Sequence, residues 1–445
     1  MTLTAQLAEH FSRLDYTDVP AEKAEEMKRL LLDHLGVALA GSRTDTGRLA
    51  GEFAAELAGA PQATVVGSGE RVPAVHAAFA NAISSHSIEL DDVDDEALFH
   101  FGPPVMAAAL ATAELVGEGG RELITAALAG CEMMNRVSTA TNPALRDRGF
   151  HTTPTCGVFG AAVAAGRLLR LTPEQMTSAL GLAGGQASGL MEMYGPSMQK
   201  RLNPGPAARN GVTAALLAQR GFTGSDLIIE GQRGFAAAFS GHFDAERLMA
   251  GLGTDSPVPI EYKPYACARP IHNAIECALL IREQERRPAA DLERITVYRH
   301  PAWADYHTNS KPRTYHEAQM SLPYSVAVAF VDGAALLDQY STERLADELV
   351  GWLAERVTIV RDASLPRGVS CRMVAEFRDG GSATSQVDHP KGSLRNPLST
   401  PELEAKFRLL AKPVIGPDRV EKVVTKVRGL DAVTDVRALT ALLSA

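Results

Sequence analysis

Two patterns of hydrophobicity divide this sequence into regions that must fold differently. From about residue 20 to residue 239, apolar residues recur every three or four positions, the spacing that gives a helix one apolar face. Gly, Pro or capping residues such as Thr172 bound these segments. The pattern predicts a domain of many short amphipathic helices. Its clearest segments are residues 27–39, 104–116, 157–169 and 211–221.

The second pattern runs from about residue 292 to residue 377. Alternating, β-branched stretches occur here with helical segments between them, a mixture typical of a smaller α+β unit. After a turn-rich connection at residues 388–402 the helical period returns, so we expect the C-terminal segment to pack back on the first domain. The predicted fold class is therefore mainly α. The strand-like stretches are residues 293–300, 355–362 and 370–379.

The charge balance limits the partners of the chain. Its 445 residues carry a formal net charge of −9 and give a pI near 5.8, whereas nucleic acids and anionic membranes are bound by basic surfaces. We therefore expect no nucleic-acid partner and no membrane partner. The N-terminus lacks a basic segment followed by an apolar one, and no window of the sequence is apolar enough to span a bilayer. The expected compartment is the cytoplasm.

Cysteine spacing and short motifs exclude several classes of site. The five cysteines are scattered and contain no CxxC, so neither a disulfide framework, a zinc ribbon nor an iron-sulfur cluster is predicted. The motifs of dinucleotide-binding proteins, P-loop proteins, serine hydrolases of the GxSxG type and zincins are also absent from the sequence.

An acidic stretch that ends near a helix entrance is the first candidate site. Histidine and carboxylates at these spacings could bind a divalent metal or form an acid–base pair. His100 follows, just before the predicted helix 104–116. The distal acids at 94–96 fit a solvated loop or a helix cap equally well. The acidic residues and their histidine are His86, Glu89, Asp91 and Asp92.

Basic residues stand at three further helix entrances. His151 precedes a small-residue helix, and Lys200 with Arg201 precedes helix 211–221, where a carboxylate could be held by charge and by the helix N-terminus. Close helix packing and simple solvation are the alternatives. His272 enters another helix, which suits a neutral base or a structural histidine. Tyr306, in the loop after the first strand, could donate a proton or merely pack.

Taken in order, these segments resemble the MmgE/PrpD family over nearly the whole chain. The resemblance implies a large all-helical domain made from residues 1–264 and 395–445, a smaller α+β lid of residues 265–394, a homodimer and no cofactor or metal. The matching segments include residues 85–93, 149–162, 200–208, 317–330 and 390–399, together with the helix start at His272.

The family resemblance also implies the activity and the residues that carry it. The expected function is a 2-methylcitrate dehydratase-like hydro-lyase that acts on a small di- or tricarboxylate, with an iminodisuccinate-like epimerase or a cis-aconitate-like decarboxylase as alternatives. The positions that match the family's catalytic residues are His100, His151, Lys200, His272 and Tyr306. The expected substrate-binding residues are Glu89, Asp92, Arg201, Asn203 and Arg269.

Four positions depart from the family pattern, and they are expected to change the charge and shape that are recognised. Glu89 stands in place of Asp, Val93 in place of Thr, Phe101 in place of Pro and Asn203 in place of His.

One chemical scheme covers the three activities. His151 or His272 would remove a proton next to a carboxylate while Lys200 and Arg201 stabilise the developing negative charge. Tyr306 or His100 would then protonate a leaving hydroxyl, which gives dehydration. Reprotonation from the other face gives epimerisation, and loss of carbon dioxide gives decarboxylation. Two other classes stay open: a non-catalytic metabolite-binding relative and a metal-dependent hydrolase with His86, Glu89, Asp91 and Asp92 as ligands.

Overall fold

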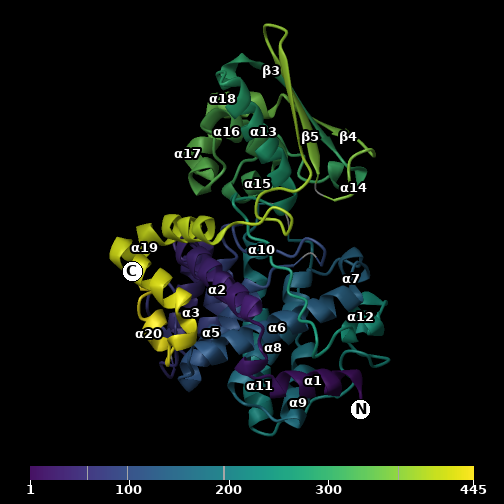
Figure 1. Cartoon of the computed structure of the whole chain (residues 1–445), viewed down its shortest axis with the longest axis vertical. Coiled ribbons are helices and arrows are strands. Elements are labelled where there is room, and N and C mark those ends of the chain that lie inside the picture. The colour runs from purple at the N-terminus through teal and green to yellow at the C-terminus, as the bar shows by residue number, and fades with distance from the viewer. Residues whose placement is uncertain (58, 98, 194–195, 369, 445) are drawn as a thin grey trace.

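The computed structural model describes residues 1–57, 59–97, 99–193, 196–368 and 370–444. Figure 1 shows a larger helical body that contains both ends of the chain and a smaller body with a sheet above it. The prediction of a mainly α fold with a small α+β part is confirmed. Among the described residues, no helix is both long enough and apolar enough to cross a bilayer.

The helical body is built around α8, whose small residues let its neighbours approach closely. α8 packs against α5, α6, α9 and α11. A Cβ on Gly160 of α8 would lie 2.6 Å from the carbonyl oxygen of Gly130 on α6, so the two backbones touch where both residues are glycine. The main helices are α1 (Leu3–Arg13), α2 (Ala21–Gly41), α3 (Asp45–Glu56), α4 (Ala74–Ser85), α5 (Ala107–Val116), α6 (Gly120–Thr141), α8 (Thr152–Leu168), α9 (Pro173–Gly184), α11 (Pro204–Gln219) and α19 (Thr400–Arg428).

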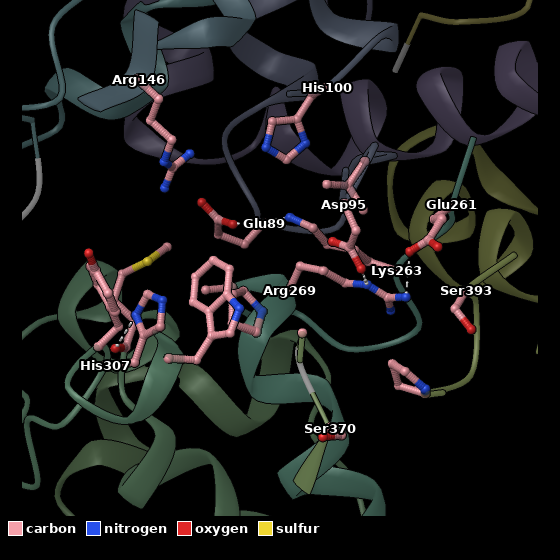
Figure 2. A pocket seen from close by; sticks show the side chains of 18 of the residues that line it. Glu89, Asp95, His100, Arg146, Glu261, Lys263, Arg269, His307, Ser370 and Ser393 are labelled. Atoms are coloured by element: carbon pink, nitrogen blue, oxygen red, sulfur yellow. Dashed lines mark hydrogen bonds and ion pairs between the residues drawn. The ribbon is translucent and has the colours of Figure 1, made fainter. Parts of the chain in front are cut away.

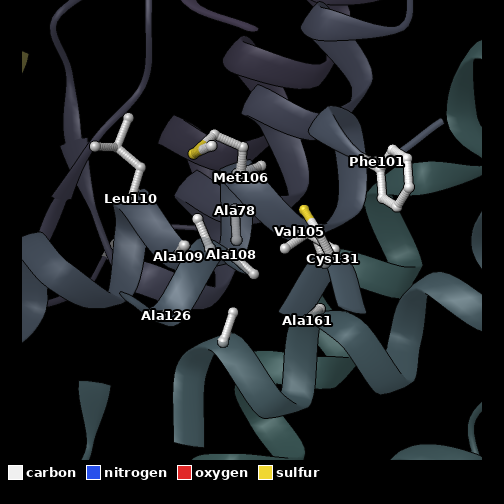
Figure 3. Close-up of a cluster of buried hydrophobic side chains, with 14 of the residues drawn as sticks. Ala78, Phe101, Val105, Met106, Ala108, Ala109, Leu110, Ala126, Cys131 and Ala161 are labelled. Atoms are coloured by element: carbon white, nitrogen blue, oxygen red, sulfur yellow. The ribbon is translucent and has the colours of Figure 1, made fainter. Parts of the chain in front are cut away.

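Small apolar side chains fill the space between these helices. Figure 3 shows alanines of α4, α5, α6 and α8 packed with Val105, Met106 and Cys131, all of them buried. Short side chains allow close packing at the density of protein interiors. The five cysteines are all buried and free, as expected for small hydrophobic residues. Shorter elements of this body are α7 (Ala144–Asp147), α10 (Gln199–Leu202), α12 (Ala245–Met249), α20 (Arg437–Thr440), the π-helical turn η2 (Gly102–Met106) and the short strands β1 (Ala63–Thr64) and β2 (Arg71–Val72).

The C-terminal segment packs back on the first helices, as predicted. α19 lies along α2, and Figure 1 shows the yellow C-terminal helices beside the purple N-terminal ones. α19 changes direction at Gly416, whose φ of 75° lies in the left-handed region. Beyond it, residues 430–433 close over the start of α6, where the amide of Gly120 donates to the carbonyl oxygen of Val433 at 2.7 Å.

Replacing Gly120 by alanine is expected to destabilise the protein by about 1–3 kcal/mol, the usual cost of overpacking. The new Cβ would lie 1.7 Å from the carbonyl oxygen of Leu430, so the C-terminal segment must move away from α6. The matched control is Gly351→Ala, because a Cβ there meets nothing within 4 Å inside helix α18 (Glu348–Ala354). Urea unfolding midpoints measure both variants, and equal midpoints would contradict this account of the C-terminal contact.

The smaller body is a four-stranded sheet with helices packed against it. The strand order is β4-β3-β5-β6, with β3 and β4 parallel and the other two pairs antiparallel. Alternate residues of β5 are buried, and α13 packs on β5 and β6. The strands are β3 (Leu292–Arg299), β4 (Val357–Arg361), β5 (Cys371–Phe377) and β6 (Ser382–Val387), and the helices are α13 (His272–Glu285), α14 (Pro301–Ala304), α15 (Tyr315–Gln319), α16 (Leu322–Asp332), α17 (Thr342–Leu345) and α18.

Two separate apolar cores accompany this division. One draws on residues 7–262 and 398–443, and the other is made mainly of residues 266–387, with a few contributions from α2, the segment 88–90 and α19. The domain boundaries after residues 264 and 394 remain a prediction that agrees with this separation. Between the bodies, the amide of Tyr262 donates to the carbonyl oxygen of Gly392 at 3.0 Å, so both chain crossings lie side by side.

Candidate active site between the two bodies

A cavity of about 980 Å³ lies where the two bodies meet. Six of the ten predicted site residues line it: Glu89, His100, His151, Lys200, Arg269 and Tyr306. Four do not appear on its wall: Asp92, Arg201, Asn203 and His272. Figure 2 shows Glu89, His100 and Arg146 reaching toward one shared space, with the lid residue His307 on another side of it. The site therefore combines side chains from both bodies.

Glu89 is the centre of a buried charge cluster. Its carboxylate contacts the ammonium of Lys200 and the guanidinium of Arg201, and Oε2 lies 3.1 Å from Nζ of Lys263. Glu89 has φ 56°, a left-handed backbone conformation that costs about 1–3 kcal/mol for a residue with a side chain. Strain of this kind persists where the surrounding contacts enforce it, and three cations do so here.

Lys200 and Arg201 reach the cluster from the short helix α10, and they have different surroundings. Lys200 lines the cavity. Burial, with Arg201 and Lys263 beside it, lowers the pKa of the Lys200 ammonium well below its usual range, and the contact with Glu89 opposes this shift. Arg201 is fully buried and also donates to the carbonyl oxygen of His86 at 3.2 Å and to Oε1 of Gln319 at 2.9 Å. Arg201 therefore supports the cluster from behind through its contact with Glu89, and its direct contact with substrate stays a prediction.

Lys263, Arg146 and His307 line the cavity and were not selected from the sequence. Lys263 is 1% exposed and lies 3.8 Å from Oδ1 of Asp91 as well as beside Glu89. The only local feature of Lys263 in the sequence is that it directly precedes a proline in a turn-rich segment. The guanidinium of Arg146 has no ion pair or hydrogen bond to another described residue, so its charge on the cavity wall is available to a ligand.

The hydrogen bonds of His100 define which ring nitrogen carries a hydrogen. Nδ1 lies 2.5 Å from the carbonyl oxygen of Asp92 and 3.1 Å from Oδ2 of Asp91, and both of these atoms only accept. Nδ1 therefore donates, and in the neutral ring Nε2 has a lone pair. Burial lowers the pKa of His100, despite the opposing charge of Asp91, so the ring is neutral near pH 7. Neutral His100 is suited to accept a proton.

His86 and Asp91 lie behind His100 and hold it in place. Nδ1 of His86 donates to Oδ2 of Asp91 at 2.7 Å, the same oxygen that His100 approaches, and the two rings have centroids 5.0 Å apart. Burial lowers the pKa of His86 to about 3. These three side chains are also the only group of metal-ligand type found among the described residues. Its membership differs from the proposed set of metal ligands, since Glu89 binds cations and Asp92 binds amides.

His151 stands at the start of α8 with its ring on the cavity. Nδ1 of His151 is 3.0 Å from the side-chain nitrogen Nδ2 of Asn203, a residue that lies between α10 and α11. Burial, followed by the neighbouring His86 and His100, lowers the pKa of His151 well below its usual range. His151 is therefore a second neutral imidazole beside the Glu89 cluster. Asn203 acts on the cavity through this ring.

Asp92 has a structural position that the sequence did not predict. Its two oxygens accept the amides of Phe101 and Gly102 at 2.7 and 2.9 Å, which anchors the entrance to η2. Burial and the charge of Asp91 raise the pKa of Asp92 to about 8. Asp94 is likewise buried and accepts the amides of Glu96 and Ala97, so it is a buried loop cap with no solvated side chain. Neither carboxylate lines the cavity.

His272 is fully buried and is not on the cavity wall. Nε2 lies 3.2 Å from the carbonyl oxygen of Cys267, and Nδ1 lies 3.4 Å from Nη1 of Arg269. Both ring nitrogens therefore have partners within the protein, and the role of His272 as the base stays a prediction. Arg269 itself lines the cavity and forms ion pairs with Asp95 at 3.0 Å and Glu261 at 2.7 Å. His272 helps to orient this arginine.

Tyr306 lies on the lid side of the cavity, in the loop after α14, and is 57% exposed. Its ring packs near Trp303 with centroids 5.7 Å apart. His307 follows with φ 63°, and its Nδ1 donates to the carbonyl oxygen of Met320 at 3.1 Å. The loop thus presents Tyr306 at the mouth of the cavity and His307 on its wall.

His34 of α2, buried close to Asp92, is expected to make folding stability depend on pH. Neither ring nitrogen has a hydrogen-bond partner among the described residues, and burial lowers its pKa to about 3. Between pH 6.5 and that value the unfolded chain binds a proton that the folded state excludes, so stability falls as pH falls. His34→Leu should therefore gain about 2 kcal/mol relative to the wild type between pH 6.5 and 5. Urea titrations at pH 8, 6.5 and 5 measure this, and parallel stability curves would refute it.

The chain is similar in sequence to known proteins over most of its length. Residues 5–248 match the family model of the MmgE/PrpD N-terminal domain, and residues 265–431 match that of the MmgE/PrpD C-terminal domain. The cis-aconitate decarboxylase-like protein oryM of Aspergillus oryzae is 31% identical over 99% of this chain and 97% of its own length. A cis-aconitate decarboxylase of Aspergillus terreus (strain NIH 2624 / FGSC A1156) is 32% identical over 99% of this chain and 96% of its own. The human cis-aconitate decarboxylase is 27% identical over 94% and 90%.

Proposed function

Because this chain belongs to the MmgE/PrpD family, we propose that it is a lyase that removes carbon dioxide from a small unsaturated tricarboxylate, with cis-aconitate as the first candidate. The named relatives support the decarboxylase alternative more than the dehydratase that the sequence favoured. The observation that most supports this proposal is that cationic side chains lie beside neutral histidines. Lys200, Lys263 and Arg146 line one cavity together with His100 and His151.

The reaction of cis-aconitate defines what the site must supply. This acid has a carboxylate on a methylene group beside a carbon–carbon double bond. When that carboxylate leaves as carbon dioxide, the electron pair of the broken bond forms a new double bond. The former π pair moves to the former vinyl carbon, which carries another carboxylate, and that carbon takes up one proton. The reaction therefore needs a stabiliser of negative charge and a proton donor, and it needs no oxidant or reductant.

The cations are suited to the first task. Negative charge develops on the carboxylate next to the former vinyl carbon, and fixed cations in a water-poor site stabilise such charge strongly. Lys200 and Lys263 are held in place through Glu89, so little reorganisation accompanies the reaction. Arg146, with no ion pair to another described residue, would bind a carboxylate that stays on the substrate.

The proton donor follows from the two cavity histidines. In neutral His100 the N–H is used on Asp92 and Asp91, so its cavity side carries only a lone pair. His151 is therefore the proposed donor: a proton passes from its neutral ring to the former vinyl carbon. The imidazolate left behind would be stabilised by Lys200 and Lys263 on the same cavity wall and would regain a proton from water once the product leaves. Tyr306 at the cavity mouth is a secondary candidate. General acids of this kind contribute about 10²–10⁴-fold to a rate.

Dehydration is the second candidate, and one observation favours it. The lone pair on His100 could remove a proton next to a carboxylate, while a donor across the cavity protonates a leaving hydroxyl. A hydroxy acid such as 2-methylcitrate would then lose water with no loss of carbon.

Product analysis with chelator-treated protein tests the proposal. Cis-aconitate, citrate, 2-methylcitrate and tartrate are supplied separately, and released carbon dioxide and the proton NMR spectrum of each mixture are recorded. The proposal expects carbon dioxide and a dicarboxylate with one carbon fewer from cis-aconitate alone. Loss of water from 2-methylcitrate without carbon dioxide would favour the dehydratase. Turnover that appears only after a divalent metal is added would favour the hydrolase class.

A further inference from the structure

Asn203 is not on the cavity wall, and its side chain reaches the cavity through the ring of His151. Its side-chain amide nitrogen, Nδ2, makes two contacts: it lies 3.0 Å from Nδ1 of His151 and 2.8 Å from the thioether sulfur of Met193. Asn203 stands between α10 and the first turn of α11, close to Lys200 in the chain, and from there its side chain reaches both His151 and Met193.

The methionine determines which way the amide faces. A thioether sulfur can accept a hydrogen bond but cannot donate one, so the amide atom beside it must be the NH₂ group. The same nitrogen lies 3.0 Å from Nδ1 of His151. One of its two hydrogens is therefore donated to Met193 and the other to His151. Nδ1 of His151 must therefore accept, which means that it carries a lone pair.

The neutral imidazole then has only one place for its hydrogen. The low pKa of buried His151 keeps the ring neutral near pH 7, and a neutral imidazole has one N–H. With Nδ1 as the acceptor, that hydrogen is on Nε2, which has no hydrogen-bond partner among the described residues of the chain. His151 lines the cavity, so this N–H is available to a bound molecule.

We propose that Asn203 is a positioning residue that fixes His151 in its Nε2–H tautomer and so makes it a proton donor toward the cavity. The catalytic half of this statement rests on the proposed function, whereas the tautomer itself does not. His100 has the opposite arrangement: acceptors on its Nδ1 leave a lone pair on Nε2. The two neighbouring imidazoles therefore differ: His151 has its hydrogen on Nε2, whereas His100 has a lone pair on Nε2.

Nitrogen NMR of histidine reads the tautomer directly. The protein is labelled with ¹⁵N-histidine, and the His151 signals are assigned by their absence in His151→Gln. At pH 8 the wild type should show a non-protonated Nδ1 and a protonated Nε2 at His151. In Asn203→Asp the new carboxylate can only accept, so Nδ1 should become protonated. Asn203→Ala should show a mixture of the two tautomers and serves if the aspartate variant does not fold.

The matched control is Asn210→Asp, the same change seven positions further along the chain, inside α11. The side chain of Asn210 donates to the carbonyl oxygen of Gln186, at 3.4 Å, and makes no contact with His151. This control should leave the His151 signals unchanged. A protonated Nδ1 in the wild type, or the same spectrum in the wild type and Asn203→Asp, overturns the proposal.

Kinetics separate this proposal from the proposed function. A wrong tautomer of a catalytic histidine lowers kcat by up to about 10⁴-fold, so Asn203→Asp should lose at least about tenfold in kcat with little change in KM. A changed tautomer with unchanged kcat overturns proton donation by His151 and leaves the tautomer assignment standing. If the wild type shows the expected tautomer but decarboxylates none of the acids, the proposed function fails while the positioning role of Asn203 is supported.

Discussion

Replacing Lys200 by alanine should lower kcat/KM by about 10²–10³-fold, the typical cost of removing one stabiliser of developing charge. The ammonium lies on the cavity wall beside Glu89, where it faces any bound carboxylate. Without it, the negative charge that forms as carbon dioxide leaves has one fixed cation fewer. Initial rates with cis-aconitate over a range of concentrations measure the effect, and the loss should fall mainly in kcat.

Folding should survive the loss of Lys200. Glu89 keeps its contacts with Arg201 and Lys263, so no buried carboxylate is left without a partner. The matched control is Lys311→Ala, which removes a lysine that pairs with Glu355 on the lid surface and is 72% exposed on its side chain. That control should keep full activity. A folded Lys200→Ala protein with wild-type kcat/KM would refute the role of this cation.

Replacing His151 by glutamine should lower kcat by about 10²–10⁴-fold, because the proposed proton donor is lost while the size and polarity of the side chain are largely kept. KM should change little, since the cations that bind the carboxylates remain. The control is His76→Gln on α4, a half-buried histidine away from the cavity wall. Equal kcat for His151→Gln and the wild type would move the donor role to Tyr306, where the corresponding substitution is Tyr306→Phe.

Most of the fold could be predicted from hydrophobic periodicity. The segments 104–116, 157–169 and 211–221 overlap α5, α8 and α11, and the three strand-like stretches overlap β3, β4 and β5. β6 was not predicted, because the sequence of Ser382–Val387 has few large apolar residues and the strand is recruited by pairing with β5. Between the strands, α17 and α18 are two short helices and not one longer helix, because Asp347 caps α18 by accepting the amide of Val350.

The candidate site could be predicted only in part, because local patterns locate helix entrances and not the direction of each side chain. His100, His151 and Lys200 lie at such entrances and line the cavity. His272 has the same local pattern, but the chain turns its ring inward onto Cys267 and Arg269. Lys263 and Arg146 belong to no motif. They reach the site through tertiary contacts between segments far apart in sequence, which single-sequence reasoning does not provide.

Turnover of cis-aconitate in deuterated buffer, followed by proton NMR, tests whether this protein is a decarboxylase that protonates carbon. We expect one molecule of carbon dioxide for each acid consumed and one deuterium at the former vinyl carbon of the product. The deuterium marks the carbon that received the proton, so it reports the proposed step itself. Carbon dioxide release without deuterium at that carbon would contradict the mechanism, and deuterium exchange or loss of water without carbon dioxide would contradict the decarboxylase.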